Sequence, residues 1–117
     1  MIYISNLFEM AHYARVLRAG YLVSLVQQEF QPPTSEGVRP ERHHRVAVDD
    51  ICEPMADLVA PGETHVRGLI AFLGDWPGSE PLLLHCYAGV SRSTAAALIA
   101  LTLRAKGREM EAGRALH

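Results

Sequence analysis

Hydrophobic residues of this chain gather in short runs that alternate with segments of helical periodicity. Four apolar runs have the length and composition of strands, and they are listed here in chain order: Ile2–Ile4, Tyr21–Val26, His44–Val48 and Leu82–His85. The run Tyr21–Val26 is apolar at nearly every position, which is typical of a strand covered on both faces of a sheet. We therefore expect it to lie inside the sheet.

Apolar residues recur at helical spacing in three further segments, Leu7–Arg18, Glu63–Trp76 and Ser93–Lys106. The third is apolar nearly all round, so we expect it to be buried on most sides. Gly107 is predicted to end this helix, after which Glu109–His117 would begin another. The alternation of strands and helices predicts an α/β sandwich, with a mainly parallel central sheet of about four to five strands flanked by helices.

The segment from Gln27 to Arg42 is polar and is interrupted by several prolines, so it shows no regular periodicity. A loop this long is usually a binding loop or locally disordered, and both interpretations stay open. Apart from this segment nothing divides the chain, and its 117 residues are predicted to form one domain.

Composition narrows the functional classes. The chain is 49% hydrophobic and 21% charged with a net charge of −2, which gives no reason to expect nucleic acid or an anionic membrane as a partner. We find no signal-like N-terminus, and the apolar run Ala95–Leu103 is too short to span a bilayer. With two cysteines and no disulfide framework, the expected location is the reducing cytoplasm.

The candidate chemistry lies in the stretch PLLLHCYAGVSRST, where a strand leads into a small-residue loop and then a helix. The five residues between Cys86 and Arg92 can curl so that their backbone N–H groups form an anion-binding nest at a helix N-terminus. These phosphate-binding residues are Tyr87, Ala88, Gly89, Val90 and Ser91. The same positive field favours a thiolate, so Cys86 is predicted to have a lowered pKa and to be a nucleophile.

Three neighbours complete this loop. The planar fork of Arg92 can hold two phosphoryl oxygens and neutralise charge in the transition state. The hydroxyl of Ser93 can donate to the Cys86 sulfur and ease its departure, while the His85 ring is expected to orient the backbone and tune the thiolate. The residue types of this loop indicate phosphoryl transfer.

The stretch HCYAGVSRST resembles the His-Cys-x5-Arg-Ser/Thr signature of cysteine-dependent protein phosphatases. Its Ala-Gly-x-Ser-Arg-Ser pattern is most similar to the dual-specificity and bacterial tyrosine phosphatase branch. This resemblance implies a two-step hydrolysis through a phosphocysteine, without a metal or another cofactor. Cys86 then acts as the nucleophile, Arg92 as the phosphate clamp and Ser93 as the hydroxyl that helps to release the intermediate. Phosphate, sulfate or vanadate would be ligands of the loop.

A proton donor is needed for the leaving oxygen, and the alternation Val46, Val48, Asp50 places Asp50 on one side of a strand end. Its distance from Cys86 along the chain matches the spacing that the resemblance implies for the general acid. Asp49 stays a rival because a shift of one residue in register would exchange the two side chains. Asp57 is a poorer candidate.

The other motifs give weaker evidence for a functional role. Cys52 has no activating neighbour in the sequence and is expected to be an inert thiol. His43 and His44 resemble a ligand pair, but no further spaced ligand completes a metal site, so they are interpreted as polar residues at a strand end.

The leading hypothesis is a phosphomonoesterase that acts on phosphotyrosine, with phosphoserine and phosphothreonine as further candidate substrates, in proteins or on small phosphomonoesters. Two alternatives stay open: a catalytically weak phosphate-binding module, and a thiol enzyme similar to rhodanese or arsenate reductase. Related domains usually continue with one or two more helices that pack against the helix after the signature loop. Since the sequence stops soon after that helix, either it is cut short or a second copy covers the helix.

Overall fold

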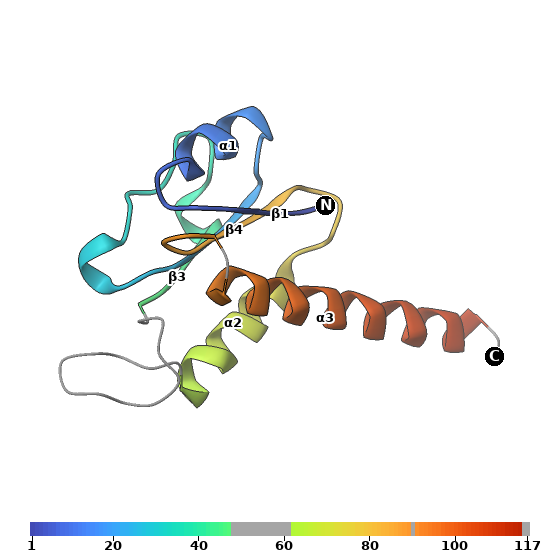
Figure 1. The fold of residues 1–117 in the computed structure, drawn as a ribbon. Coiled ribbons are helices and arrows are strands. Elements are labelled where there is room, and N and C mark those ends of the chain that lie inside the picture. The colour runs from blue at the N-terminus through green and yellow to red at the C-terminus, as the bar shows by residue number, and fades with distance from the viewer. Residues whose placement is uncertain (48–61, 90, 116–117) are drawn as a thin grey trace.

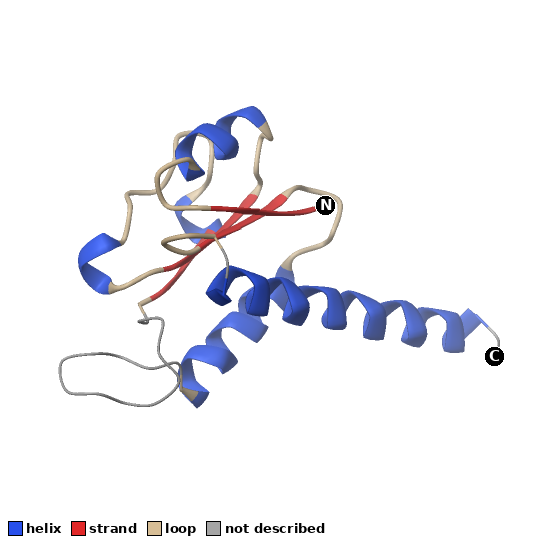
Figure 2. Ribbon diagram, in the orientation of Figure 1, coloured by secondary structure: helices blue, strands red, loops and turns tan. Residues whose placement is uncertain are grey.

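The computed structural model describes residues 1–47, 62–89 and 91–115, with side chains described as far as residue 105 except that of Ser91. Its four strands are β1 (Ile2–Ser5), β2 (Tyr21–Leu25), β3 (His43–Val46) and β4 (Leu82–His85). They form one sheet in the order β1-β4-β2-β3, and every neighbouring pair is parallel. The predicted α/β fold with a parallel sheet is confirmed, and β2 is an inner strand as its apolar sequence requires (Figures 1 and 2).

Three helices flank the sheet: α1 (Met10–Val16), α2 (Glu63–Asp75) and α3 (Ser91–Ala115). Two short 3₁₀ turns, η1 (Gln28–Phe30) and η2 (Pro40–Arg42), lie in the polar segment between β2 and β3. Helix α1 begins later than its periodicity predicts, because the Asn6 side chain accepts a hydrogen bond from the Glu9 N–H at 2.8 Å and closes a turn first. Helix α2 follows its prediction to within one residue.

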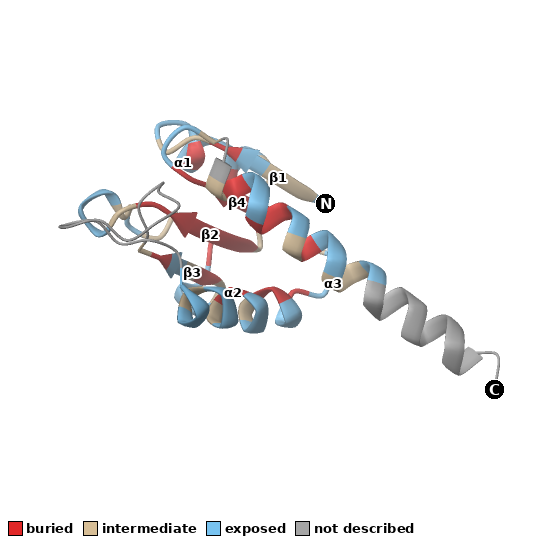
Figure 3. Ribbon diagram, turned by 60° about the horizontal axis from the view of Figure 1, so that its bottom comes forward, coloured by how far each residue is buried: buried red, intermediate tan, exposed pale blue. Residues whose placement is uncertain are grey.

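The sheet separates two hydrophobic cores. On one face α2 and α3 cover alternate strand residues such as Val23 and Leu84, while on the other face α1 covers Leu22 and Leu83. Both faces of β2 and β4 are thus buried, which explains why these strands are almost continuously apolar (Figure 3). The carboxyl ends of the strands are left to carry the polar residues.

Helix α3 differs from its prediction in two respects. It runs without interruption through Gly107, because one glycine costs only about 1 kcal/mol in a helix of otherwise good helix formers. It is also buried on one face only. Ala96 and Ala100 pack in the core, whereas Leu98 and Leu101 are 61% and 55% exposed. Figure 3 shows buried and exposed positions alternating along α3.

Within residues 1–47, 62–89 and 91–115, no helix has both the length and the apolar character needed to cross a membrane.

Candidate active site

The loop that begins at Cys86 lies between the carboxyl end of β4 and the first turn of α3 (Figure 2). Strand β4 ends at His85 and α3 begins at Ser91, so the predicted strand, loop and helix are all present. The carboxyl edge of a parallel sheet is where ligands bind in folds of this kind, and the amino end of a helix is attractive to anions. The position of the loop therefore suits an anionic ligand.

The Cys86 side chain is 1% exposed, and polar groups of Gly89 and Ser93 lie close to its sulfur. The Gly89 backbone N–H donates to Cys86 Sγ at 3.2 Å, and Ser93 Oγ lies 3.3 Å from the same sulfur. Ser93 comes from the first turn of α3 and is fully buried. Hydrogen bonds of this kind favour the charged form of an acceptor, so the arrangement is one that stabilises a thiolate.

Arg92, also in the first turn of α3, directs its guanidinium across the edge of the sheet. Its Nη1 donates to Gln27 Oε1 at 3.4 Å, and Gln27 follows β2 after a single residue. The structure thus brings Arg92 to the same edge of the sheet as Cys86. Gln27 is a neighbour that the sequence did not reveal, because it lies in a polar segment without a recognisable motif.

Gly89 gives the loop a backbone conformation that other residues rarely adopt. Its φ is +75°, and a Cβ atom there would lie 2.7 Å from the carbonyl oxygen of Ser5. We expect Gly89→Ala to lower the free energy of unfolding by about 1–3 kcal/mol and to weaken phosphate binding, because the loop has to move away from β1. Urea unfolding and phosphate titration measure both effects.

The matched control is Gly74→Ala. Gly74 lies within α2, where a Cβ atom would meet no heavy atom within 4 Å, so alanine should leave stability unchanged or raise it slightly. Wild-type stability and phosphate affinity in Gly89→Ala would show that the loop does not need the left-handed conformation.

His85 is fully buried and shares a hydrogen bond with Ser24 Oγ, 2.5 Å from its Nε2. Burial lowers the pKa of the His85 ring to about 4, although a contact with the Cys86 backbone partly opposes that shift. The imidazole is consequently neutral at pH 7, which suits an orienting group. Its Nδ1 is also buried, and it has no hydrogen bond of good geometry within the described residues.

Comparison with solved structures shows a phosphatase-like fold. The chain superposes on the crystal structure of Cydia pomonella PTP-2 phosphatase with a TM-score of 0.55 and 23% sequence identity, covering 82% of this chain and 61% of that one. The chain thus spans less than two thirds of the length of that phosphatase. The sequence matches no protein-family profile, and a search of curated proteins found no significant relative.

Several predicted residues are not tested by this geometry. Asp50, its rivals Asp49 and Asp57, and Cys52 lie outside the described residues, as does Val90. Of Ser91 only the backbone is described. Tyr87 and Ala88 lie in the loop with their side chains exposed. Within residues 1–47, 62–89 and 91–105, no three His, Cys, Asp or Glu side chains are grouped so that they could hold a metal ion.

Aromatic rings gather beside the loop. The Tyr87 ring lies 5.4 Å from that of Phe8 and 5.5 Å from that of Phe30, measured between ring centroids. Phe8 precedes α1 and is 76% exposed, while Phe30 belongs to η1. The long polar segment therefore packs against the Cys86 loop through Phe30 and against the first turn of α3 through Gln27.

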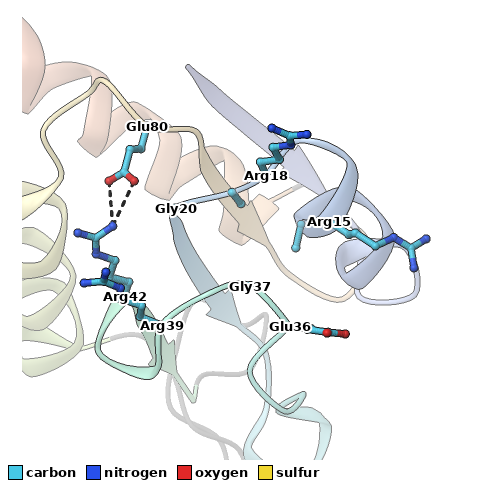
Figure 4. A pocket seen from close by; sticks show the side chains of 10 residues that line it. Arg15, Arg18, Gly20, Glu36, Gly37, Arg39, Arg42 and Glu80 are labelled. Carbon is cyan, nitrogen blue, oxygen red and sulfur yellow. Dashed lines mark hydrogen bonds and ion pairs between the residues drawn. The ribbon is translucent and has the colours of Figure 1, made fainter.

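A basic hollow of about 410 Å³ lies at the opposite edge of the sheet, beside the residues that precede β2, β3 and β4 (Figure 4). Arg42 and Glu80 pair across it at 3.0 Å. The side chains of Arg15 and Arg18 point outward rather than toward a common centre (Figure 4). This hollow is remote from Cys86 and has no convergent set of anion ligands, so we do not assign the chemistry to it.

Proposed function

We propose that the protein is a metal-independent phosphomonoesterase that hydrolyses phosphotyrosine, and also phosphoserine or phosphothreonine, through a phosphocysteine. The observation that carries the proposal is the environment of Cys86: its sulfur receives the Gly89 N–H and lies beside Ser93 Oγ at the amino end of α3. The phosphatase-like fold supports it.

In the first step the Cys86 thiolate attacks phosphorus, a P–S bond forms, and the P–O bond to the leaving group breaks. Arg92 and the N–H groups of the loop hold the equatorial oxygens, and Asp50 gives its proton to the leaving oxygen. In the second step the Asp50 carboxylate takes a proton from water, whose oxygen attacks phosphorus. The P–S bond then breaks, releasing inorganic phosphate while Ser93 donates to the departing sulfur.

The exposed aromatic rings of Phe8, Phe30 and Tyr87 favour an aryl over an alkyl leaving group, because aromatic surfaces stack on one another. This supports phosphotyrosine as the preferred substrate. Phosphorylated proteins and small aryl phosphates are the proposed partners, and we propose the cytoplasm as the place where the thiol stays reduced.

The test of the proposal is vanadate-sensitive hydrolysis of 4-nitrophenyl phosphate and of phenyl phosphate in the presence of a chelator. For phenyl phosphate, whose leaving oxygen needs a proton, Asp50→Asn should lower kcat by about 10²-fold and remove the fall of kcat at high pH. That fall is expected because a general acid stops working once it is deprotonated.

Asp49→Asn is the matched control and should change kcat by less than about threefold, because its carboxyl group takes no part in the proposed proton transfer. The opposite pattern would identify Asp49 as the acid. If the wild-type chain shows no vanadate-sensitive hydrolysis, the proposed activity is wrong. A single burst without turnover would indicate the phosphate-binding module, and turnover of thiosulfate or arsenate would indicate the other thiol chemistries.

A further inference from the structure

A row of hydrogen-bonded polar side chains leads from the Cys86 loop across three strands, and it is buried at His85, Ser24 and His43 and exposed at its far end, Arg45. The His85 Nε2 lies 2.5 Å from Ser24 Oγ, which lies 2.7 Å from His43 Nε2. The His43 Nδ1 in turn lies 2.9 Å from Thr34 Oγ1, to which Arg45 Nη2 donates at 3.2 Å. Ser24 is fully buried and His43 is 7% exposed, so the row passes through the interior.

The parallel register builds this row. Ser24 on β2 is paired directly with His85 on β4 and with Arg45 on β3. His43 lies two residues before Arg45, so both side chains are on one face of β3. Alanine or valine would fill the buried positions without burying polar groups, whereas a buried polar group left unpaired is destabilising. The hydrogen bonds between Ser24 and the two imidazoles therefore need an explanation.

The number of hydrogens that each group can donate determines which group donates and which accepts in each hydrogen bond of the row. Ser24 has one hydroxyl hydrogen, and among the described residues its Oγ has only the two imidazoles as partners. If that hydrogen is used in a hydrogen bond, one neutral ring donates from Nε2 to Ser24 and the other accepts from it. Burial, followed by the charges of Arg45, His85 and His44, lowers the pKa of His43 to about 4, so both rings are neutral at pH 7. The remaining question is which ring donates.

Arg45 answers it. The guanidinium can only donate, and its positive charge disfavours an N–H of His43 that points toward it. Thr34 therefore accepts from Arg45 and donates to His43 Nδ1, which leaves the His43 Nε2–H to donate to Ser24. Ser24 donates to His85 Nε2, and the proton of the His85 ring is then on Nδ1, beside the Cys86 backbone.

We propose that Ser24, His43, Thr34 and Arg45 are positioning residues that hold His85 as its Nδ1–H tautomer, so that a donor rather than a lone pair faces the segment that carries Cys86. A lone pair there would repel the thiolate, whereas an N–H supports it. This inference rests on the proposed function, in which Cys86 reacts as a thiolate.

¹⁵N NMR of the imidazole nitrogens in the intact chain tests the tautomers of His85 and His43 directly. We expect His85 to be protonated at Nδ1 and His43 at Nε2. Finding His85 protonated at Nε2 would overturn the proposal, because the row would then run in the opposite direction.

The pH dependence of Cys86 alkylation by iodoacetamide tests the consequence in a Cys52→Ser background. Thr34→Val removes the hydroxyl that links Arg45 to His43, and should lower the alkylation rate at pH 7 by about threefold to tenfold and shift the profile to higher pH. Thr34→Ser keeps the hydroxyl and should restore the wild-type profile.

Thr102→Val is the control for the same change elsewhere, since the Thr102 hydroxyl donates only to the Leu98 carbonyl at 2.8 Å on the exposed side of α3. Ser24→Ala should lower the rate of Cys86 alkylation more than Thr34→Val does, provided that the variant folds. If it does not fold, the result for Thr34→Val tests the proposal. Identical alkylation profiles for Thr34→Val and Thr34→Ser would refute the positioning role. An Nδ1–H tautomer and a shifted profile without any aryl phosphate hydrolysis would instead refute only the proposed function.

Discussion

We expect Cys86→Ser to abolish the turnover of aryl phosphates, with kcat lowered by at least about 10⁴-fold, while the binding of inorganic phosphate is kept. The reason is that a serine hydroxyl stays protonated at neutral pH, so no nucleophile forms, whereas the backbone N–H groups of the loop and Arg92 are unchanged. The serine oxygen also stays within reach of the Gly89 N–H, which is 3.2 Å from the sulfur in the wild type. The assay pairs 4-nitrophenyl phosphate hydrolysis with calorimetric titration of phosphate.

Cys52→Ser is the natural control, because it makes the same chemical change at the other cysteine of the chain. It should leave kcat and phosphate affinity at their wild-type values. Vanadate-sensitive hydrolysis that survives Cys86→Ser would remove Cys86 from the mechanism. Loss of phosphate binding in the same variant would mean that the loop itself had changed shape.

We expect Arg92→Ala to lower kcat/KM for aryl phosphates by about 10³-fold or more and to weaken phosphate binding as well. Arg92→Lys should recover only a small part of either quantity, because an ammonium group is a point charge and cannot hold two phosphoryl oxygens in a planar fork. Steady-state kinetics and phosphate titration on both variants measure the charge and the geometry separately.

Arg67 provides the control pair. It lies on the exposed side of α2, where it pairs with Glu63 one turn away, so Arg67→Ala and Arg67→Lys should leave kcat/KM unchanged. Wild-type kcat/KM in Arg92→Lys would show that the fork is not used, and wild-type kcat/KM in Arg92→Ala would show that Arg92 is not the phosphate clamp.

Much of the fold was predictable because it depends on local pattern. The apolar run of β2 indicated a strand buried on both faces, and β2 is an inner strand with all five residues buried. The stretch from Leu82 to Ser93 likewise indicated a strand, a loop and a helix in that order, which the structure contains. The spacing of apolar residues and the residue types that form turns are properties of neighbouring residues, so they can be read directly from the sequence.

Apart from the late start of α1, the errors concern α3, whose end and burial are not determined by local sequence signals. Gly107 suggested a helix end, yet the flanking residues are good helix formers and the helix continues. Its apolar outer face suggested burial on most sides, but Leu98 and Leu101 are exposed. Burial depends on what packs against a helix, and the composition of the helix alone does not tell that.

By itself the sequence determined the strand, the small-residue loop and the helix that carry Cys86 and Arg92, together with the left-handed conformation that Gly89 permits. Only the tertiary structure decided that Ser24 and His43 stand beside His85, and that Gln27 meets Arg92. The physical reason is that these contacts depend on the strand order β4-β2-β3 and on its register, which join residues far apart in the chain. No local pattern of polar and apolar residues specifies which strands become neighbours.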